Sequence, residues 1–374
     1  MQKNICITSY NAICNIGNNI DDMFRNAICA TQDYLIKDKI GIESYFGKIN
    51  CDLPEISDNN FDLRCNRILL YLINSLKISF EELINKYPSF KIGVVVATTN
   101  TGIEEFCTTK NKFHAQLGNP AEFIKQYFNL DGFCQCVSTA CSSGIKAFSV
   151  ARDVIAAGFC EAVIVAGVDS LARIPIYGFN SLGVLSQDKC IPFSKNRSGI
   201  NIGEGGGIFI VEKGQNNFGI KGIGETSDAY HPTCPDPDAV QAKTAINSAL
   251  IESQINAQDI DYINLHGTGT VANDLMEANA INNIFGENIP SSSTKSMTGH
   301  CLGAAASIEI ALCLKSIEKQ ILLPHVYDNE FDEKLKHINL INKSKNAIIK
   351  NILCTSFGFG GTNSAIIIGD TNEL

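Results

Sequence analysis

The sequence lacks the features that would place the chain in a membrane or bind it to zinc. No uninterrupted apolar run approaches the roughly 18 residues that a membrane-spanning helix needs. The first ten residues contain a single lysine and no long apolar segment, which argues against a signal peptide. There is no Cys-x-x-Cys pair, and none of the 6 histidines has a second histidine at His-x-x-x-His spacing, so no metal site is expected.

Positive charge is also in short supply. The 30 lysines and arginines are outnumbered by 39 aspartates and glutamates, which gives a net charge of −9. This acidic balance argues against generic nucleic-acid binding and against adhesion to anionic membranes. The 374 residues suffice for about two domains' worth of core, so burial does not limit the fold.

Cysteine, in contrast, is abundant. The 15 cysteines are an odd number at irregular spacing in a long chain, which does not fit a disulfide scaffold. We expect a reduced, cytoplasmic protein whose cysteines are mostly small apolar core residues. One or two of them should have a chemical role.

Short β-branched runs alternate with segments that have helical periodicity, which indicates α/β layers. The runs end in Gly, Ser or Thr, and their nearly continuous apolar character suits a sheet that is covered on both faces. Strands are expected at residues 91–98, 135–138, 161–166, 207–212, 262–265, 352–357 and 364–368, and helices at 64–76, 142–157, 239–253, 272–285 and 303–319.

The two halves of the chain resemble each other. In each half a buried strand leads into a turn rich in Thr and Gly, and a Ser/Thr-rich segment later approaches a helix of small residues. No linker rich in proline, serine or charge separates the halves. We therefore expect one compact unit made of two similar α/β halves, residues 1–215 and 216–374.

One cysteine stands out by its context, in the segment Val137-Ser-Thr-Ala-Cys141-Ser-Ser-Gly144. A strand runs through a turn of small residues directly into a helix, which places Cys141 at a helix N-terminus. Unpaired backbone N–H groups and the helix dipole favour an anion there, so the sequence predicts a thiol with a lowered pKa. On this motif alone, a buried structural cysteine remains the alternative.

A histidine follows an apolar strand in the segment His266-Gly-Thr268-Gly-Thr270. The C-terminal end of such a strand is where open α/β sheets place ligands. Asp274 and Glu277 follow on the next helix, where they either orient a basic side chain or simply favour the first helical turn.

Two further motifs lie closer to the C-terminus. Lys295 and a second histidine, His300, precede a helix whose first turns carry almost no side-chain bulk. The segment from Ser356 to Asn363 contains Phe357 and Phe359 in a glycine-rich turn between two strands. Its backbone can approach a ligand closely and donate N–H groups, with an aromatic ring as a lid.

Together these motifs resemble the active-site set of the elongating beta-ketoacyl-ACP synthases, condensing enzymes of the thiolase superfamily. The similarity covers nearly the whole chain, including the stretches 178–183, 192–205 and 222–225. The resemblance implies a thiolase-like α/β fold of five layers, α-β-α-β-α, built from a duplicated half.

The resemblance also implies a role for each motif in 3-oxoacyl-ACP synthesis. Cys141 would take the acyl chain, while His266 and His300 would hydrogen-bond the malonyl thioester and support its decarboxylation. Lys295 would hold the charge network with Glu277 as its partner. The N–H groups of Cys141 and Phe359 would form the oxyanion hole, with the Phe359 ring as a gate and Phe357 beside it. Asp274, Thr268 and Thr270 would support the site.

The implied partner is an acyl carrier protein, whose phosphopantetheine carries the substrates, and no cofactor is required. Because such carriers are acidic, the enzyme needs local cations, and the resemblance places them at Arg64, Arg67, Lys195 and Arg197. Ordinary surface charges, with Arg197 in a structural ion pair, are the alternative. Members of the family dimerise through the strand near the nucleophile, so the chain would form a homodimer or a heterodimer with a related subunit.

Alternatives within and outside the family remain open to different degrees. A degradative thiolase would need a Cys-x-Gly turn near the C-terminus, but Cys354 is followed by Thr-Ser; an initiating synthase would have asparagine in place of His300. A chain-length partner subunit loses the nucleophile, which is present here. A binding scaffold that has only inherited the site is the alternative from another functional class.

The sequence indicates the type of reaction more clearly than the biosynthetic pathway. Ala306 stands where the family has glycine, and Ser194 replaces an acidic residue. Residues 106–132 differ from the housekeeping enzymes, and residues 118–132 and 224–231 resemble the condensing subunits of aryl polyene pathways. Fatty-acid synthesis and specialised polyene or polyketide synthesis both remain candidates.

Overall fold

The computed structural model describes residues 5–214 and 216–371. Its main feature is a sheet of 11 strands in the order β13-β11-β10-β15-β16-β9-β1-β8-β6-β4-β5. From one edge to the other these strands are Asn339–Leu340, Pro290–Ser292, Tyr262–Asn264, Asn351–Gly358, Thr362–Asp370, Phe218–Ser227, Ile5–Cys14, Gly205–Lys213, Ala162–Asp169, Ile92–Ala97 and Cys134–Val137.

This sheet consists of one arrangement used twice. In chain order, the strands of the first half are β1, β4, β5, β6 and β8, and they lie in the order third, second, fourth, fifth, first. Strands β9, β10, β11, β15 and β16 of the second half lie in the same order, with the same pattern of parallel and antiparallel pairs. The two halves meet where β1 pairs with β9 over two residue pairs. The predicted boundary at residue 215 lies outside the described residues.

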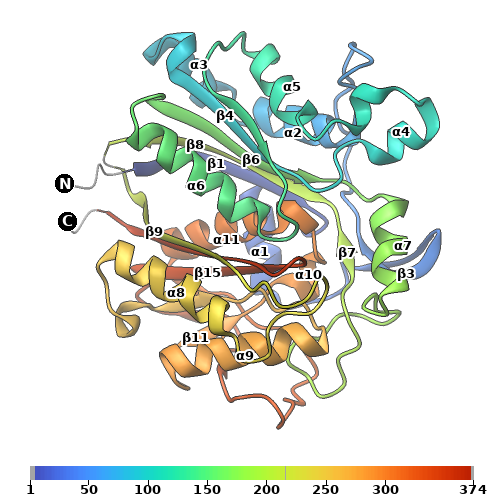
Figure 1. Ribbon diagram of the computed structural model, residues 1–374, viewed down its shortest axis with the longest axis vertical. Helices are drawn as coiled ribbons and strands as arrows, with labels where there is room; N and C mark the ends of the chain where they lie inside the picture. The colour runs from blue at the N-terminus through green and yellow to red at the C-terminus, as the bar shows by residue number, and fades with distance from the viewer. Residues whose placement is uncertain (1–4, 215, 372–374) are drawn as a thin grey trace.

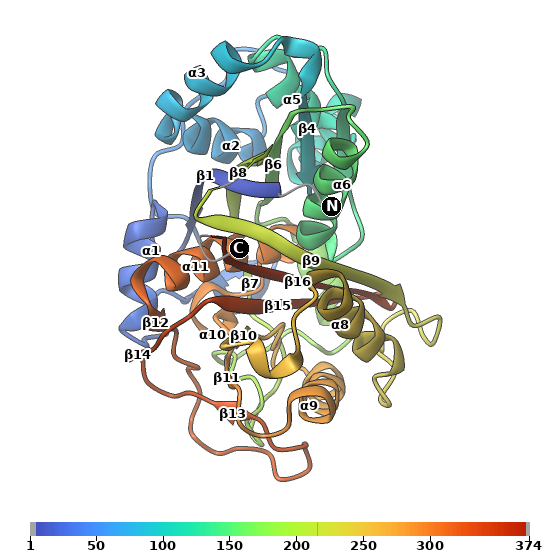
Figure 2. The same cartoon turned by 90° about the vertical axis from the view of Figure 1, so that its left-hand side faces the viewer.

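Helices cover the two sets of strands in three layers (Figure 1). The outer layer of the first half contains α2 (Arg64–Ser75), α3 (Lys77–Lys86) and α5 (Asn119–Tyr127), and that of the second half contains α8 (Val240–Ser253) and α9 (Val271–Phe285). Between the sets lie α6 (Ser143–Ala156), α11 (Ala305–Lys319) and α1 (Ile20–Ile28), as Figure 2 shows from the side. The predicted five-layer α/β fold is confirmed.

Successive side chains of a strand pack into different hydrophobic clusters, as this layering requires. On β15, Ile352 and Cys354 pack into the central hydrophobic cluster, whereas Leu353 packs into the outer cluster beneath α8 and α9. Since successive side chains of a strand point to opposite faces, both faces of β15 are covered and all three residues are fully buried.

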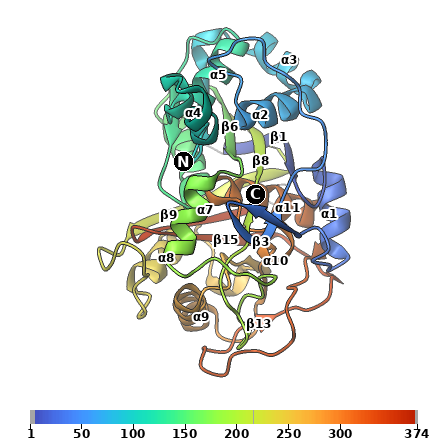
Figure 3. The same cartoon turned by 90° about the vertical axis from the view of Figure 1, so that its right-hand side faces the viewer.

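The predicted strands and helices are all present, with ends shifted by a few residues. Not predicted from the sequence were strands β1, β9, β11 and β13 of the large sheet and the helices α1, α3, α4 (Ile103–Thr109), α5, α7 (Arg173–Ser181) and α10 (Lys295–Thr298). Helices α4 and α7 lie on one side of the molecule with strand β3 (Ile42–Gly47) (Figure 3). In the described part of the chain, no helix is long and apolar enough to span a membrane.

Small side chains let the central helices approach each other near their N-termini. A Cβ atom at Gly144 of α6 would lie 2.8 Å from the Cβ of Ala306 in α11, and one at Gly167 would lie 2.2 Å from Ser307 Oγ. Ala306, which replaces the expected glycine, is therefore accommodated because Gly144 faces it. This contact brings the segment before α6 next to the segment before α11.

Most of the cysteines lie in the core, as predicted. All 15 are free thiols, and nine of them are buried. The majority thus serve as small apolar core residues.

Candidate active site

Cys141 is held by a tight turn between β5 and α6. The turn requires a left-handed backbone at Ala140, whose φ is +54°. Ser143 Oγ accepts a hydrogen bond from the N–H of Thr139 at 2.8 Å, and Ser356 Oγ donates to the carbonyl of Cys141 at 2.8 Å. Since a strained backbone at a non-glycine residue persists only where its surroundings fix it, the turn holds the thiol in one position.

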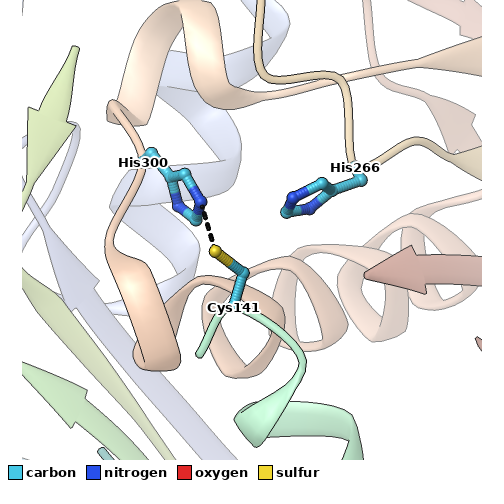
Figure 4. Close-up of side chains that lie close together, drawn as sticks. All are labelled: Cys141, His266 and His300. Carbon is cyan, nitrogen blue, oxygen red and sulfur yellow. Dashed lines mark hydrogen bonds between the residues drawn. The ribbon is translucent and has the colours of Figure 1, made fainter. Parts of the chain in front are cut away.

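Two histidine rings face the thiol from the second half of the chain (Figure 4). His300 Nε2 lies 3.0 Å from Cys141 Sγ, and the rings of His266 and His300 stand 5.3 Å apart at 84°. The N–H of Leu302 donates to His300 Nδ1 at 3.2 Å, so Nδ1 carries no proton in the neutral ring. The proton therefore sits on Nε2, which points toward the sulfur as a donor.

Burial decides the protonation states of the three groups. It raises the pKa of the Cys141 thiol to about 12, although Lys295 and the N–H groups of Cys141 and Phe359 act in the opposite direction. The predicted lowering of this pKa is therefore wrong, because the thiol at the helix N-terminus is shielded from water. Burial and the nearby Lys295 hold the pKa values of His266 and His300 well below their usual range. At neutral pH the site contains a neutral thiol and two neutral imidazoles.

The partner of Lys295 differs from the prediction. Its Nζ donates to Glu309 Oε1 at 2.5 Å and to the carbonyl of His266 at 2.6 Å. Burial alone would disfavour its charge, but Glu309 outweighs this and raises the pKa of Lys295. Glu309 is the one charged residue in the apolar segment 305–314, a signal that the sequence reasoning did not use.

Glu277 caps the turn that carries His266 instead of pairing with Lys295. Its two carboxylate oxygens accept the N–H groups of His266 and Gly267, both at 2.7 Å, and Thr355 Oγ1 donates to it at 2.8 Å. Burial raises the pKa of Glu277 to about 7. The predicted ion pair with Lys295 is thus wrong, although the charge of Glu277 still helps to raise the pKa of Lys295. Glu277 supports the site by holding the backbone of His266.

The remaining supporting residues shape the following turn. Asp274 accepts the N–H groups of Phe193 at 2.8 Å and Gly269 at 3.2 Å, and burial raises its pKa to about 6. Thr268 Oγ1 and Thr270 Oγ1 lie 3.0 Å apart. Both threonines line the cavity in front of the histidines.

Two cavities meet at the thiol. The first, of about 280 Å³, is lined by both histidines and by Phe357, whose ring stands edge-on to His266 at 6.0 Å. The second, of about 340 Å³, is lined by Thr99, Asn100, Thr101, Ile174 and Leu302, among others. Cys141, Phe179 and Phe359 line both cavities.

The two shared phenylalanine rings lie 5.6 Å apart, so they stand together between the cavities. Phe359, which is predicted to act as a gate, therefore lies where the two cavities meet. Phe179 lies in the stretch 178–183, which resembles the family, but the resemblance implied no role for this residue.

The predicted docking cations all pair with acidic side chains. Arg197 binds Asp332 at 2.7 Å and lies 3.5 Å from Asp274, and its side chain is only 3% exposed. Its predicted role in docking is wrong, because it is a buried structural ion pair. The other three are partly exposed, and their partners are Glu204 for Arg64, Asp62 for Arg67 and Glu330 for Lys195.

Comparison with known families matches most of the chain. The family model described as "Beta-ketoacyl synthase, N-terminal domain" matches residues 87–217, and "Beta-ketoacyl synthase, C-terminal domain" matches residues 218–327. The chain therefore belongs to the beta-ketoacyl synthase family, and it is a condensing enzyme of the acyltransferase type.

Individual relatives have more specific names. The chain is 28% identical to 3-oxoacyl-[acyl-carrier-protein] synthase 2 of Staphylococcus aureus, over 98% of each chain. It is also 28% identical to nodulation protein E of Rhizobium leguminosarum bv. trifolii, over 98% of this chain and 99% of that one. A chain from the structure of the ketosynthase ApeO in complex with its chain length factor ApeC, from Xenorhabdus doucetiae, is 33% identical. That match has a TM-score of 0.94 and covers 99% of this chain and 98% of the other.

Proposed function

We propose that the protein is a 3-oxoacyl-[acyl-carrier-protein] synthase that condenses a Cys141-bound acyl chain with a malonyl group on a carrier protein. The observation that carries this proposal is the convergence of one thiol and two neutral imidazoles at the junction of two cavities. One cavity can then receive the thioester arm while the other receives the acyl chain.

The first half-reaction transfers the acyl group to sulfur. Cys141 Sγ attacks the carbonyl carbon of the donor thioester, the new C–S bond forms, and the pantetheine thiolate leaves with the proton that Cys141 gives up. The N–H groups of Cys141 and Phe359, which already point at the sulfur, would hold the oxyanion that develops. Each such donor contributes about 3–4 kcal/mol to the transition state.

The second half-reaction forms the carbon–carbon bond. The malonyl C–COO⁻ bond breaks, CO₂ leaves, and the electron pair remains as an enolate on the thioester. The enolate carbon attacks the carbonyl on Cys141, and the Cys141 thiolate leaves and is then protonated. Neutral imidazoles at His266 and His300 suit this step, because their N–H groups stabilise the enolate oxygen without protonating the reacting carbon.

The tautomer of His300, with its proton on Nε2, favours a mechanism without a metal ion over a metal-assisted one. Donor atoms of Cys141, His266 and His300 lie within 4.8 Å of one another, which is close enough for a metal ion. A metal at His300 Nε2 would move the ring proton to Nδ1, where it would face the N–H of Leu302. Histidine ligands normally direct that second N–H to an acceptor, so the surroundings of His300 favour a hydrogen-bond donor over a metal ligand.

For partners we propose an acyl carrier protein and a homodimer or a heterodimer with a related ketosynthase-like subunit. The names of the relatives support both, since one acts with a carrier protein and another is in complex with a chain length factor. Residues 118–132 and 224–231, which resemble the condensing subunits of aryl polyene pathways, support a specialised polyene or polyketide pathway over housekeeping fatty-acid synthesis. The 15 free thiols support a reduced, cytoplasmic location.

The Cys141→Ala variant tests the proposal. Intact-mass analysis should detect an acyl-enzyme in the wild type and none in the variant, whereas both should decarboxylate malonyl carrier. A labelled acyl-enzyme in the variant would refute the assignment of the nucleophile. If the wild type forms no acyl-enzyme with saturated, unsaturated or aryl acyl carriers, the chain is a catalytically reduced partner subunit or a scaffold instead.

A further inference from the structure

A buried carboxylate outside the motifs discussed so far lies directly behind the site. Asp169, at the end of β6, is fully buried. Its Oδ1 accepts the hydroxyl of Thr98 and the N–H groups of Thr99 and Asn100, at 2.9 to 3.0 Å. Its Oδ2 accepts the hydroxyl of Thr99 at 2.9 Å and the N–H of Gly303 at 2.7 Å. All five of these donor groups are neutral.

These donors belong to two segments with different tasks. Thr99 and Asn100 form part of the wall of the second cavity. Gly303 lies in the short 3-10 turn Leu302–Ala304, where the N–H of the preceding Leu302 fixes the tautomer of His300. The backbone of Leu302 is in the left-handed region, with a φ of +52°, so this turn depends on outside contacts to keep its shape.

The carboxylate is suited to such a link. A carboxylate has two oxygens that only accept, and here each oxygen faces one of the two segments through at least one N–H group. A neutral amide has a single accepting oxygen, so its NH₂ group would face an N–H donor on one side whichever way it turned. Asparagine, which has nearly the same shape as aspartate, therefore cannot accept hydrogen bonds from both segments.

We infer that Asp169 is a positioning residue for the second half-reaction: it joins the wall of the second cavity to the turn that orients His300. This inference rests on the function proposed above. It assigns Asp169 no contact with substrate; Asp169 acts through Gly303, Leu302 and the ring of His300.

The test compares two reactions in the Asp169→Asn variant. Decarboxylation of malonyl carrier depends on His300 and should fall at least about tenfold, because small displacements of a catalytic group cost this much or more. Alkylation of Cys141 by iodoacetamide at pH 8 should stay the same or become faster, because the Asp169 carboxylate raises the pKa of the thiol. A merely structural role would lower both rates together.

A second variant reaches the same contact from the other side. A Cβ atom at Gly303 would lie 2.9 Å from Asp169 Oδ2, so Gly303→Ala displaces the carboxylate without removing its charge. It should slow decarboxylation about as much as Asp169→Asn, without accelerating alkylation. The matched control is Asp261→Asn, which removes a carboxylate that accepts the N–H groups of Lys350 and Asn351 at the end of β10 remote from His266. This control should keep both rates within about twofold of the wild type.

The possible outcomes separate the two proposals. If the wild type is active and Asp169→Asn decarboxylates within twofold of it, the inference is overturned and the proposed function stands. Parallel loss of alkylation, decarboxylation and thermal stability in Asp169→Asn would also overturn it. If the wild type neither decarboxylates malonyl carrier nor forms an acyl-enzyme, the proposed function fails and the inference fails with it.

Discussion

The two halves of the molecule share a strand order but use the same turn for different purposes. In each half a turn follows the second strand, after β4 in the first half and after β10 in the second. Thr99 and His266 each stand two residues past the end of that strand. Thr99 lines the second cavity, whereas His266 faces the thiol. The scaffold therefore provides two equivalent positions, and only one of them carries a catalytic side chain.

A buried carboxylate caps both turns, but it comes from a different element in each half. Asp169 reaches the first turn from β6, and Glu277 reaches the second from α9. Each accepts two successive backbone N–H groups. The difference shows that each turn has to be held in place by a buried carboxylate. The element that supplies the carboxylate is not the same in the two halves.

Replacing either histidine should remove most of the malonyl decarboxylation, the activity that only the second half supports. In His266→Ala and His300→Ala we expect malonyl decarboxylation to fall by about 10²–10³-fold, because each loses an N–H donor to the enolate oxygen. Thr99→Ala, at the position equivalent to His266, should lose far less. Rates of CO₂ release measured side by side would check this, and equal losses in all three variants would contradict the comparison.

The carboxylates of the second half should differ in their effect on stability. Glu309→Gln leaves the ammonium group of Lys295 buried and unpaired, which costs about 3–5 kcal/mol of unfolding free energy. Glu277→Gln removes an acceptor from neutral N–H groups and should cost about 1–3 kcal/mol. Urea unfolding of the two variants would rank them, and the reverse order would restore Glu277 as the partner of Lys295.

The response to pH should separate the thiol from the histidines. Because the pKa of Cys141 is raised to about 12, its alkylation should keep accelerating from pH 7 to pH 10 without levelling off. The pKa values of His266 and His300 are lowered, so both rings stay neutral above pH 6.5 and decarboxylation should vary little between pH 6.5 and 8. Because the folded protein holds both histidines neutral, their contribution to the unfolding free energy is complete above the pKa of an unfolded histidine. It is lost as the pH falls from that value toward the lower pKa of the folded state. Alkylation that levels off near pH 8 would contradict the assigned burial of the thiol.

Local sequence was sufficient to predict the motifs and the layers, because strand ends, small-residue turns and helical periodicity are short-range signals. Cys141, His266 and His300 could be found in this way, and so could the seven strands that were expected. Strand β1 was missed because its polar middle, Thr8 to Asn11, hides a strand whose partners on β8 and β9 all lie more than about 190 residues later in the chain.

The predictions that were wrong concern ion-pair partners, burial and pKa values, which only tertiary packing determines. Whether Lys295 meets Glu277 or Glu309 depends on how α9 and α11 lie around it, and their spacing in the chain does not reveal this. The burial of Arg197 beside Asp332, and the raised pKa of Cys141, both follow from atoms that are distant in the sequence. Helix position suggested an activated thiol, but desolvation outweighed it.

The narrow junction between β1 and β9 has a consequence for the whole molecule. Only two residue pairs join the sheets there, yet the thiol belongs to one half and both imidazoles to the other. Close packing in the central layer, where Gly144 meets Ala306, therefore contributes to the 3.0 Å separation between sulfur and nitrogen, together with hydrogen bonds between the halves such as that from Ser356 to the carbonyl of Cys141. A methyl group at Gly144 would push α6 and α11 apart, and the thiol and the imidazole that these helices position would move apart with them.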